Sequence, residues 1–393
     1  MTSNPLSLNV ARIELREVRL PLREPFRISS GVCTERRIML LQLFHADGSS
    51  VWSECVAGEE PNYTEETIDT AWYAITQWLA PRVLGQTVDA PGSVSRLLSR
   101  NFRGHPMARA AVEMGFWGLA AAVARLPLAR LIGGVQERVV TGISIGIQES
   151  PAALVERAQA AVAEGYQKVK LKIQPGSDIA FVHAVRAALG EDVDIAVDAN
   201  SAYTLNDVNL LKQLDAFALL MIEQPLGPDD IVRHAELQRQ LTTPICLDES
   251  IISLDRAEDM INMGSGRIIN IKPGRVGGFA TSIAIHDLCL QSGIPVWCGG
   301  MLESGVGRAY NVALASLPNF TLPGDLSPSH RYWERDLVTP EWTMDASGTV
   351  GVPLDRPGIG VTPDMDRIDD LTVRHETLIA PRSDGTSTGS SSL

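Results

Sequence analysis

The sequence predicts an α/β protein in which a closed barrel of parallel strands follows a smaller α+β unit. From about residue 140 onward, short apolar runs rich in Val, Ile and Leu are each followed by a helical pattern, which is typical of βαβ units. Before about residue 130, apolar and polar residues alternate as in antiparallel strands. The 393 residues are also enough for one large domain and a smaller companion.

The first part of the chain is expected to form strands near 10–20, 36–45 and 51–56, followed by helices near 64–82 and 105–124. We assign residues 1–130 to this α+β unit. The segment 331–380 shows no βα rhythm and is expected to run back over the unit and complete it. The Ser/Gly/Thr-rich end, residues 382–393, cannot bury a core and is predicted to be disordered.

Seven apolar runs in residues 131–330 are assigned to barrel strands. They lie at 141–147, 168–173, 193–198, 218–223, 244–248, 267–272 and 294–298. From Lys172 to Cys298 the runs end at steps of 24 to 26 residues, the length of one strand, one helix and two loops. With a last strand expected near 318–323, the pattern fits a closed barrel better than an open doubly wound sheet. No glycine-rich phosphate-binding motif follows the first run, which disfavours a dinucleotide-binding fold.

Composition narrows the classes of function. The chain is 45% hydrophobic and 21% charged, with no disordered or coiled-coil bias. A net charge of −13 without any basic run argues against nucleic acid and anionic membranes as partners. The five cysteines include no Cys-x-x-Cys pair and are interpreted as buried, reduced thiols. We find no secretion signal and no apolar stretch of ~18 residues, so we expect a cytoplasmic protein.

Five consecutive predicted strands close on ionisable side chains, namely Lys172, Asp198, Glu223, Asp248 and Lys272. The carboxyl ends of the strands of a parallel barrel meet at one rim, where active sites lie. In the run KVKLKI, strand alternation places Lys168, Lys170 and Lys172 on one face and the apolar residues on the other. These lysines should point into the barrel, where an ammonium group needs a partner or a chemical task. For Lys168 we expect only a structural partner.

The three acids should come together because they end neighbouring strands ~4.8 Å apart. Carboxylates with no histidine or cysteine beside them suit Mg²⁺ or Mn²⁺ better than zinc. Each residue alone has a simpler interpretation, since an acid can cap a helix and Lys172 can be a rim lysine that reaches water. Three acids in register between two lysine-bearing strands favour a metal site.

Further polar residues near the strand ends have two interpretations each. Asn200 can hydrogen-bond a lysine or a ligand, and Glu249 can orient a metal-bound water, but both can also shape turns. Arg275 can help to lower the pKa of Lys272 or form a loop salt bridge. The two glycines of the loop 298–305 can present backbone N–H groups to a substrate or simply make a turn.

Taken in order, these motifs resemble the enolase superfamily. They are KLK at 170–172, DAN at 198–200, IEQP at 222–225, LDES at 247–250, NIKPGRVGG at 270–278 and WCGGMLESG at 297–305. The resemblance extends over nearly all of residues 10–375. It is closest to the muconate-lactonising-enzyme subgroup and, within it, to the family of o-succinylbenzoate synthases and N-succinylamino acid (N-acylamino acid) racemases.

The resemblance implies a modified TIM barrel, (β/α)7β, under an N-terminal α+β capping domain, with one Mg²⁺ for which Mn²⁺ or Co²⁺ can substitute. By position, the metal ligands would be Asp198, Glu223 and Asp248, and the acid/base pair Lys172 and Lys272. The substrate-binding residues would be Ser144, Lys170, Asn200, Gly300, Met301 and Leu302, supported by Glu249 and Arg275. The loops 22–32 and 55–63 would select the substrate side chain. A homo-oligomer, either a dimer or an octamer, is also implied.

The implied reaction removes a proton from the carbon beside a carboxylate and passes through an enolate. Two lysines on opposite faces would racemise N-acylamino acids. In the alternative syn dehydration to o-succinylbenzoate, a step of menaquinone biosynthesis, Lys172 would move the proton and Lys272 would stabilise the intermediate as a cation.

Two alternatives stay open. A dipeptide epimerase or a muconate cycloisomerase would share the metal site and both lysines, although the loop GGMLESG lacks the Asp-x-Asp pair usual in dipeptide epimerases. A non-catalytic barrel protein, a different class, would use the acids only as a structural cation site.

Overall fold

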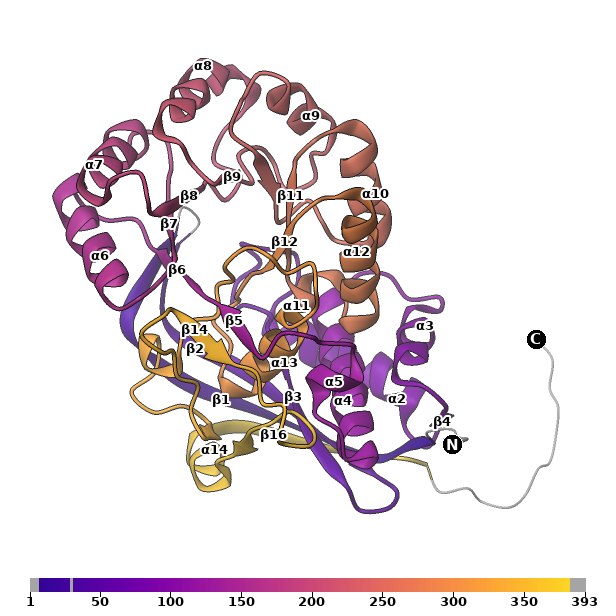
Figure 1. Ribbon diagram of the computed structural model, residues 1–393. Coiled ribbons are helices and arrows are strands. Elements are labelled where there is room, and N and C mark those ends of the chain that lie inside the picture. The colour runs from indigo at the N-terminus through magenta and orange to yellow at the C-terminus, as the bar shows by residue number, and fades with distance from the viewer. Residues whose placement is uncertain (1–6, 29–30, 382–393) are drawn as a thin grey trace.

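The computed structural model describes residues 7–28 and 31–381 (Figure 1). The predicted tail, 382–393, lies outside the described residues. The first half of the chain contains β1 (Leu8–Ile28), β2 (Gly31–His45), β3 (Ser50–Cys55), α1 (Ile68–Ala74), α2 (Ala80–Val83), β4 (Thr87–Val88), α3 (Val94–Ser99), α4 (Pro106–Ala124), α5 (Leu128–Leu131), β5 (Arg138–Val140), β6 (Gly142–Ile145), α6 (Pro151–Ala163), β7 (Lys168–Lys172), α7 (Ile179–Leu189) and β8 (Asp194–Asp198).

The second half contains α8 (Val208–Leu211), β9 (Met221–Glu223), α9 (Val232–Gln238), β10 (Ile245–Leu247), α10 (Leu254–Met263), β11 (Ile268–Ile271), α11 (Pro273–Val276), α12 (Phe279–Ser292), β12 (Val296–Cys298), α13 (Gly305–Ala315), β13 (Val338–Thr339), β14 (Thr349–Gly351), β15 (Thr362–Pro363), α14 (Met365–Leu371) and β16 (Thr372–Ile379). Most strands and helices expected from the sequence are present within a few residues. The exceptions are the strand expected near 318–323, which is absent as a regular strand, and the helix expected near 64–82, which is divided.

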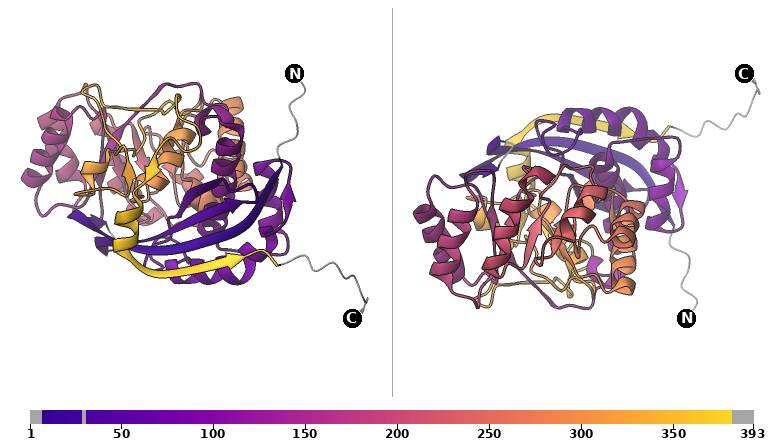
Figure 2. Two further views of the ribbon diagram at one scale, coloured as in Figure 1. Left: turned by 90° about the horizontal axis from the view of Figure 1, so that it is seen from below. Right: turned by 90° about the horizontal axis from the view of Figure 1, so that it is seen from above.

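An antiparallel sheet in the order β16-β1-β2-β3 forms the N-terminal unit. Ile13 and Leu15 of β1 are buried, and so are Val18 and Leu20, which follow a register shift in the pairing with β16. Figure 2 shows this curved sheet along one side of the molecule, with the last strand, β16, beside the first, β1. The chain therefore returns to its first sheet through β16.

The barrel contains seven parallel strands in the order β12-β11-β10-β9-β8-β7-β6. The helices that follow these strands lie around the outside (Figure 1). The strand expected near 318–323 is not a regular strand. Two isolated parallel bridges, Val296 with Phe320 and Thr141 with Gly324, join that segment to the two ends of the sheet. The fold class is a modified (β/α)7β barrel, as predicted, with a seam in place of a full eighth strand.

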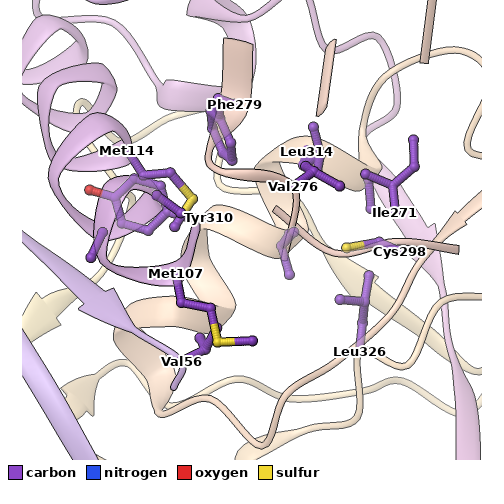
Figure 3. Close-up of a cluster of buried hydrophobic side chains, with 14 of the residues drawn as sticks. Val56, Met107, Met114, Ile271, Val276, Phe279, Cys298, Tyr310, Leu314 and Leu326 are labelled. Atoms are coloured by element: carbon purple, nitrogen blue, oxygen red, sulfur yellow. The ribbon is translucent and has the colours of Figure 1, made fainter. Parts of the chain in front are cut away.

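A cluster of buried side chains joins the N-terminal unit to the barrel (Figure 3). Val56 and Met107 belong to the first unit, and Val276, Phe279 and Leu314 belong to the barrel helices. Because a Cβ atom on Gly274 of α11 would overlap Val56, only glycine allows this close approach.

Two buried carboxylates also cross this junction. Glu54 of β3 accepts hydrogen bonds at the N-terminus of α13. Glu113 of α4 accepts the N–H groups of Phe279 and Ala280 at the N-terminus of α12. Acids of the neighbouring unit thus satisfy some of the N–H groups left unpaired at the start of both helices.

Helix α4 corrects one expectation from the sequence. It is long and apolar enough to cross a membrane by length and composition, with a mean hydropathy of 1.2 over 18 residues, although no such stretch was expected. The physical reason is its central position, since 72% of that window is buried inside the protein. Its apolar character is that of a helix packed on nearly all sides.

Candidate active site

The barrel strands bring the five predicted strand-end residues to one rim. Lys172 lies opposite Asp198 in the β7–β8 ladder, and Asp198 lies opposite Glu223 in the β8–β9 ladder. Asp248 and Lys272 directly follow β10 and β11. The three acids are at most 1% exposed, so their charges need partners within the protein.

Lys172 lies between an acid and an amide. Its Nζ atom is 2.6 Å from Oδ2 of Asp198 and 2.6 Å from Oδ1 of Asn200. Asn200 also donates from Nδ2 to Oε1 of Glu249, at 3.1 Å. Asn200 has a φ of +42°, a left-handed conformation that asparagine tolerates better than most residues. Asn200 therefore both shapes the turn after β8 and contacts the lysine.

Lys170, two residues before Lys172 on β7, lies deeper in the barrel and contacts three acids. Its Nζ atom is 2.9 Å from Oε2 of Glu223, 3.3 Å from Oδ2 of Asp198 and 2.8 Å from Oδ2 of Asp325. Below it, the fully buried Lys168 donates to the carbonyl of Pro323 and lies 3.8 Å from the centre of the Trp297 ring. The inward direction inferred for these lysines is the direction observed.

Lys272 and Arg275 share one carboxylate. Lys272 Nζ is 2.8 Å from Oδ2 of Asp248 and 3.1 Å from the hydroxyl of Tyr63. Arg275 pairs with the other oxygen of Asp248 and donates to the carbonyls of Ile251 and Asn270. Burial alone would lower the pKa of Lys272, but Asp248 and the other anionic groups outweigh it and raise that pKa well above its usual value. One interpretation of Arg275 was that it lowers the pKa of Lys272, but the protein groups together raise that pKa. Arg275 instead forms an ion pair with the same acid, Asp248.

The three acids influence one another. Burial, and after it the charge of Asp198, raises the pKa of Glu223 to about 7. Burial also acts to raise the pKa of Asp198, but Lys172 and Lys170 hold it below its usual value. For Asp248 the same balance of burial against Lys272 and Arg275 again lowers the pKa. Mutual repulsion of this kind is what a bound cation relieves.

The chemistry of Asp198, Glu223 and Asp248 suits a hard divalent cation, but the three acids are not arranged around one point. Within residues 7–28 and 31–381, no three His, Cys, Asp or Glu side chains are already grouped as a metal centre. The acids are held instead by lysines, by Arg275 and, for Glu223, by Nδ2 of Asn270 at 2.7 Å. The atoms that the three acids offer to a metal are carboxylate oxygens. Oε2 of the neighbouring Glu249 is buried without a hydrogen-bond partner. Such oxygens suit Mg²⁺ or Mn²⁺.

The loop after β12 lies against the same rim. A Cβ atom on Gly299 would be 2.7 Å from Cε of Lys272, and one on Gly300 would be 2.9 Å from the carbonyl oxygen of Asp325. The N–H of Met301 donates to Glu303, and Leu302 has a φ of +57°. The glycines therefore serve close packing, Gly299 against the side chain of Lys272 and Gly300 against the backbone of Asp325.

Ser144 is also at this wall. It pairs with Lys170 in the β6–β7 ladder, and its hydroxyl is buried without a hydrogen-bond partner. A hydroxyl in this state is available to a ligand.

Sequence reasoning missed several contacts, made by Tyr63, Gln224, Asn270, Trp297 and Asp325. Asn270 and Gln224 lie inside the quoted motifs, and Gln224 accepts the N–H groups of Asp248 and Ser250. Asp325 follows the expected last strand by two residues, which is a usable signal. Tyr63 ends the loop 55–63, which was expected to select the substrate side chain, but no local pattern indicates that its hydroxyl reaches Asp248 and Lys272.

Two family models match the chain. The model described as Mandelate racemase / muconate lactonizing enzyme, N-terminal domain, matches residues 10–133, and the model described as Enolase C-terminal domain-like matches residues 153–367. The chain belongs to the enolase superfamily. The resemblance inferred from the strand-end motifs is therefore confirmed.

Within the enolase superfamily, similar proteins carry two names. An o-succinylbenzoate synthase of Geobacillus stearothermophilus is 45% identical over 379 residues, which cover 95% of this chain and 100% of that protein. An N-succinylamino acid racemase of Amycolatopsis sp is 44% identical over 365 residues, 93% of this chain and 98% of that one. The crystal structure of a superfamily member from Listeria innocua has a TM-score of 0.92 at 40% identity and covers 95% of this chain and 100% of its own. The chain is thus an isomerase or lyase of this superfamily.

Proposed function

We propose that this enzyme removes the proton from the carbon beside a substrate carboxylate and passes through an enolate, to racemise N-succinylamino acids, to form o-succinylbenzoate by syn dehydration, or both. One observation carries the proposal. Lys172 ends β7 and Lys272 directly follows β11, and each is bonded to an acid. The three acids lie at the ends of the strands between them, β8, β9 and β10. The names of the relatives support both reactions.

We propose Asp198, Glu223 and Asp248 as ligands of one divalent cation, Mg²⁺ in first place with Mn²⁺ or Co²⁺ as substitutes. When bound, the cation supplies the positive charge that stabilises the dianion formed as the proton leaves. Proposed substrate contacts come from Ser144, Lys170, Asn200, Gly300, Met301 and Leu302. Glu249 and Arg275 would orient Asn200 and Asp248, to which they are bonded.

The two lysines would divide the proton work. In racemisation, a neutral lysine on one face accepts the α-proton, and the charged lysine on the other face returns one, which inverts the centre. Lys272, bonded to Asp248, would donate a proton in its ammonium form and would accept the α-proton of the other enantiomer in its neutral form. In the dehydration, the same positive charge would stabilise the intermediate while Lys172 alone moves the proton.

Proton exchange in heavy water tests the proposal. N-succinyl-phenylalanine of each configuration is incubated with the enzyme and Mg²⁺ or Mn²⁺, and the α-proton signal is followed by NMR. Both enantiomers should lose the signal, EDTA should stop the loss, and added cation should restore it. If no N-acylamino acid exchanges and the cyclohexadiene precursor of o-succinylbenzoate is not dehydrated, the proposal is wrong.

The same assay separates the alternatives. Exchange with dipeptides alone would point to an epimerase, and a non-catalytic barrel would bind the cation without any exchange. We further propose that residues 1–130 with 331–380 form a capping domain over a catalytic barrel of residues 131–330. In this arrangement the loops 22–32 and 55–63 select the side chain, and the enzyme is a cytoplasmic homo-oligomer.

A further inference from the structure

Lys172, Lys170 and Lys272 each bridge at least one acid of the proposed metal site and one acceptor outside it. Lys172 bonds Asp198 and Asn200, Lys170 bonds Glu223 and Asp325, and Lys272 bonds Asp248 and Tyr63, all with Nζ···O distances of 2.6 to 3.1 Å. Each lysine therefore keeps a second partner if its acid turns toward another cation.

Asp325 is the charged member of these three outer acceptors. The amide of Asn200 and the hydroxyl of Tyr63 are neutral, whereas the carboxylate of Asp325 can balance an ammonium group. Lys170 is 3% exposed, so it cannot be stabilised by water if Glu223 and Asp198 are engaged elsewhere. Its remaining anion is then Asp325, at 2.8 Å.

The backbone holds Asp325 in place independently of Lys170. Its N–H donates to the carbonyl of Cys298 at 2.9 Å, and its own carbonyl accepts from Arg308 at 2.6 Å. The next residue back, Gly324, forms the bridge to Thr141 that closes the barrel seam. Lys168 approaches the other carboxylate oxygen to 3.6 Å. The acid is thus fixed on the wall opposite Glu223.

We propose that Asp325 is the counter-ion that draws Lys170 away from Glu223 and Asp198, so that these two acids are free to bind the divalent cation. This inference rests on the proposed metal role of the acids. It makes Asp325 a positioning residue that acts through Lys170. Without the charge of Asp325, the ammonium of Lys170 would have only Glu223 and Asp198 as anions and would compete there with the divalent cation.

Calorimetric titration of the full chain with Mn²⁺ tests the inference without any measurement of activity. We expect Asp325→Asn to weaken Mn²⁺ binding by about 10- to 100-fold, as for other residues that support metal ligands. Asp336→Asn is the matched control, since Asp336 is a buried acid held by Ser329 and Gly305 and has no lysine partner. The control should bind Mn²⁺ as the wild type does.

A second background shows whether the effect passes through Lys170. In Lys170→Met, the ammonium of Lys170 no longer competes for Glu223 and Asp198, so adding Asp325→Asn should change the Mn²⁺ affinity by less than about twofold. An equal loss in both backgrounds would mean a structural role and would overturn the inference.

The remaining outcomes are also distinct. A wild type that binds no Mn²⁺ removes the proposed metal site and with it the proposed function. A wild type that binds while Asp325→Asn binds equally well removes this inference alone. If Asp325→Asn does not fold by circular dichroism, Lys168→Met/Asp325→Asn restores the local charge balance, and the same loss of affinity is required of it.

Discussion

Lys172 and Lys272 end strands on opposite sides of the acids, so each should serve one face of the substrate. We expect Lys172→Ala to slow α-proton exchange of one enantiomer of N-succinyl-phenylalanine by about 10²- to 10⁴-fold, the usual contribution of a positioned acid or base. Lys272→Ala should do the same to the other enantiomer. Both are measured by NMR in heavy water, one enantiomer at a time.

The exposed Lys212 provides the control for these variants. Lys212→Ala should exchange both enantiomers at the wild-type rate. Equal losses for both enantiomers in either active-site variant would contradict the assignment of the two lysines to opposite faces.

The rim residues could be predicted from the sequence because strand alternation and a constant step leave little freedom in where strand ends meet. Their partners could not. The hydroxyl of Tyr63 donates to Asp248 across 185 positions of sequence, and no local pattern reports such a contact. Asp325 was not predicted as a site residue because the segment before it forms only two isolated bridges, so no regular strand end marks its position.

At the scale of elements, the long helix expected near 64–82 is divided. A π-helical turn, Ile75–Leu79, separates α1 from α2. Pro81, near the start of α2, has no N–H to donate to the carbonyl of Gln77, and a widened turn just before it accommodates this loss. The spacing of apolar residues indicated a helix. It could not reveal the π-helical turn, because one such turn hardly changes that spacing.

The junction between β3 and α13 should make stability depend on pH. Burial, aided by Glu303, raises the pKa of Glu54 to about 8, although Ser304 and Gly307 donate hydrogen bonds that oppose the rise. The folded protein therefore holds this proton more tightly than the unfolded chain, where the pKa is near 4.5. The resulting stabilisation is complete below about pH 4.5 and is lost as the pH rises through 8.

Glu54→Gln removes this titration while keeping the shape of the side chain. The free energy of unfolding of the wild type minus that of the variant should be smaller at pH 8.5 than at pH 5.5, measured by urea denaturation. Glu60→Gln, at an exposed position, is the control and should show no such trend. A difference that stays constant between the two pH values would show that Glu54 does not titrate in this range.

At the scale of the whole molecule, the rhythm of the barrel and the return of the chain to its first unit were both predictable. The seam was not, because the segment 318–324 is held mainly by tertiary contacts, and its own sequence resembles that of an ordinary short strand. The closeness of the N-terminal unit to the barrel, secured by Gly274 against Val56, likewise depends on shape and leaves no periodic trace.

A shortened chain tests how much β16 contributes to the whole. Ending the chain at residue 371 removes the strand paired with β1 from Arg12 to Val18, and with it the bond from Trp72 to Glu376. We expect the melting temperature to fall by at least about 3 °C and aggregation to increase, since the edge of β1 becomes open. A chain ending at residue 381 should melt as the full chain does, and equal melting of both shortened chains would contradict the expectation.

The pairing of β1 with β16 also sets the order of events during synthesis. Strand β1 begins at Leu8 and its neighbour begins at Thr372, so at ~5–20 residues per second a ribosome needs roughly 20–70 s to supply the second after the first. During this interval the barrel can form, but one border of the first sheet has no neighbour. A nascent chain of this enzyme is thus exposed to strand-to-strand association until β16 has been synthesised, which is the period when a chaperone would be of most use.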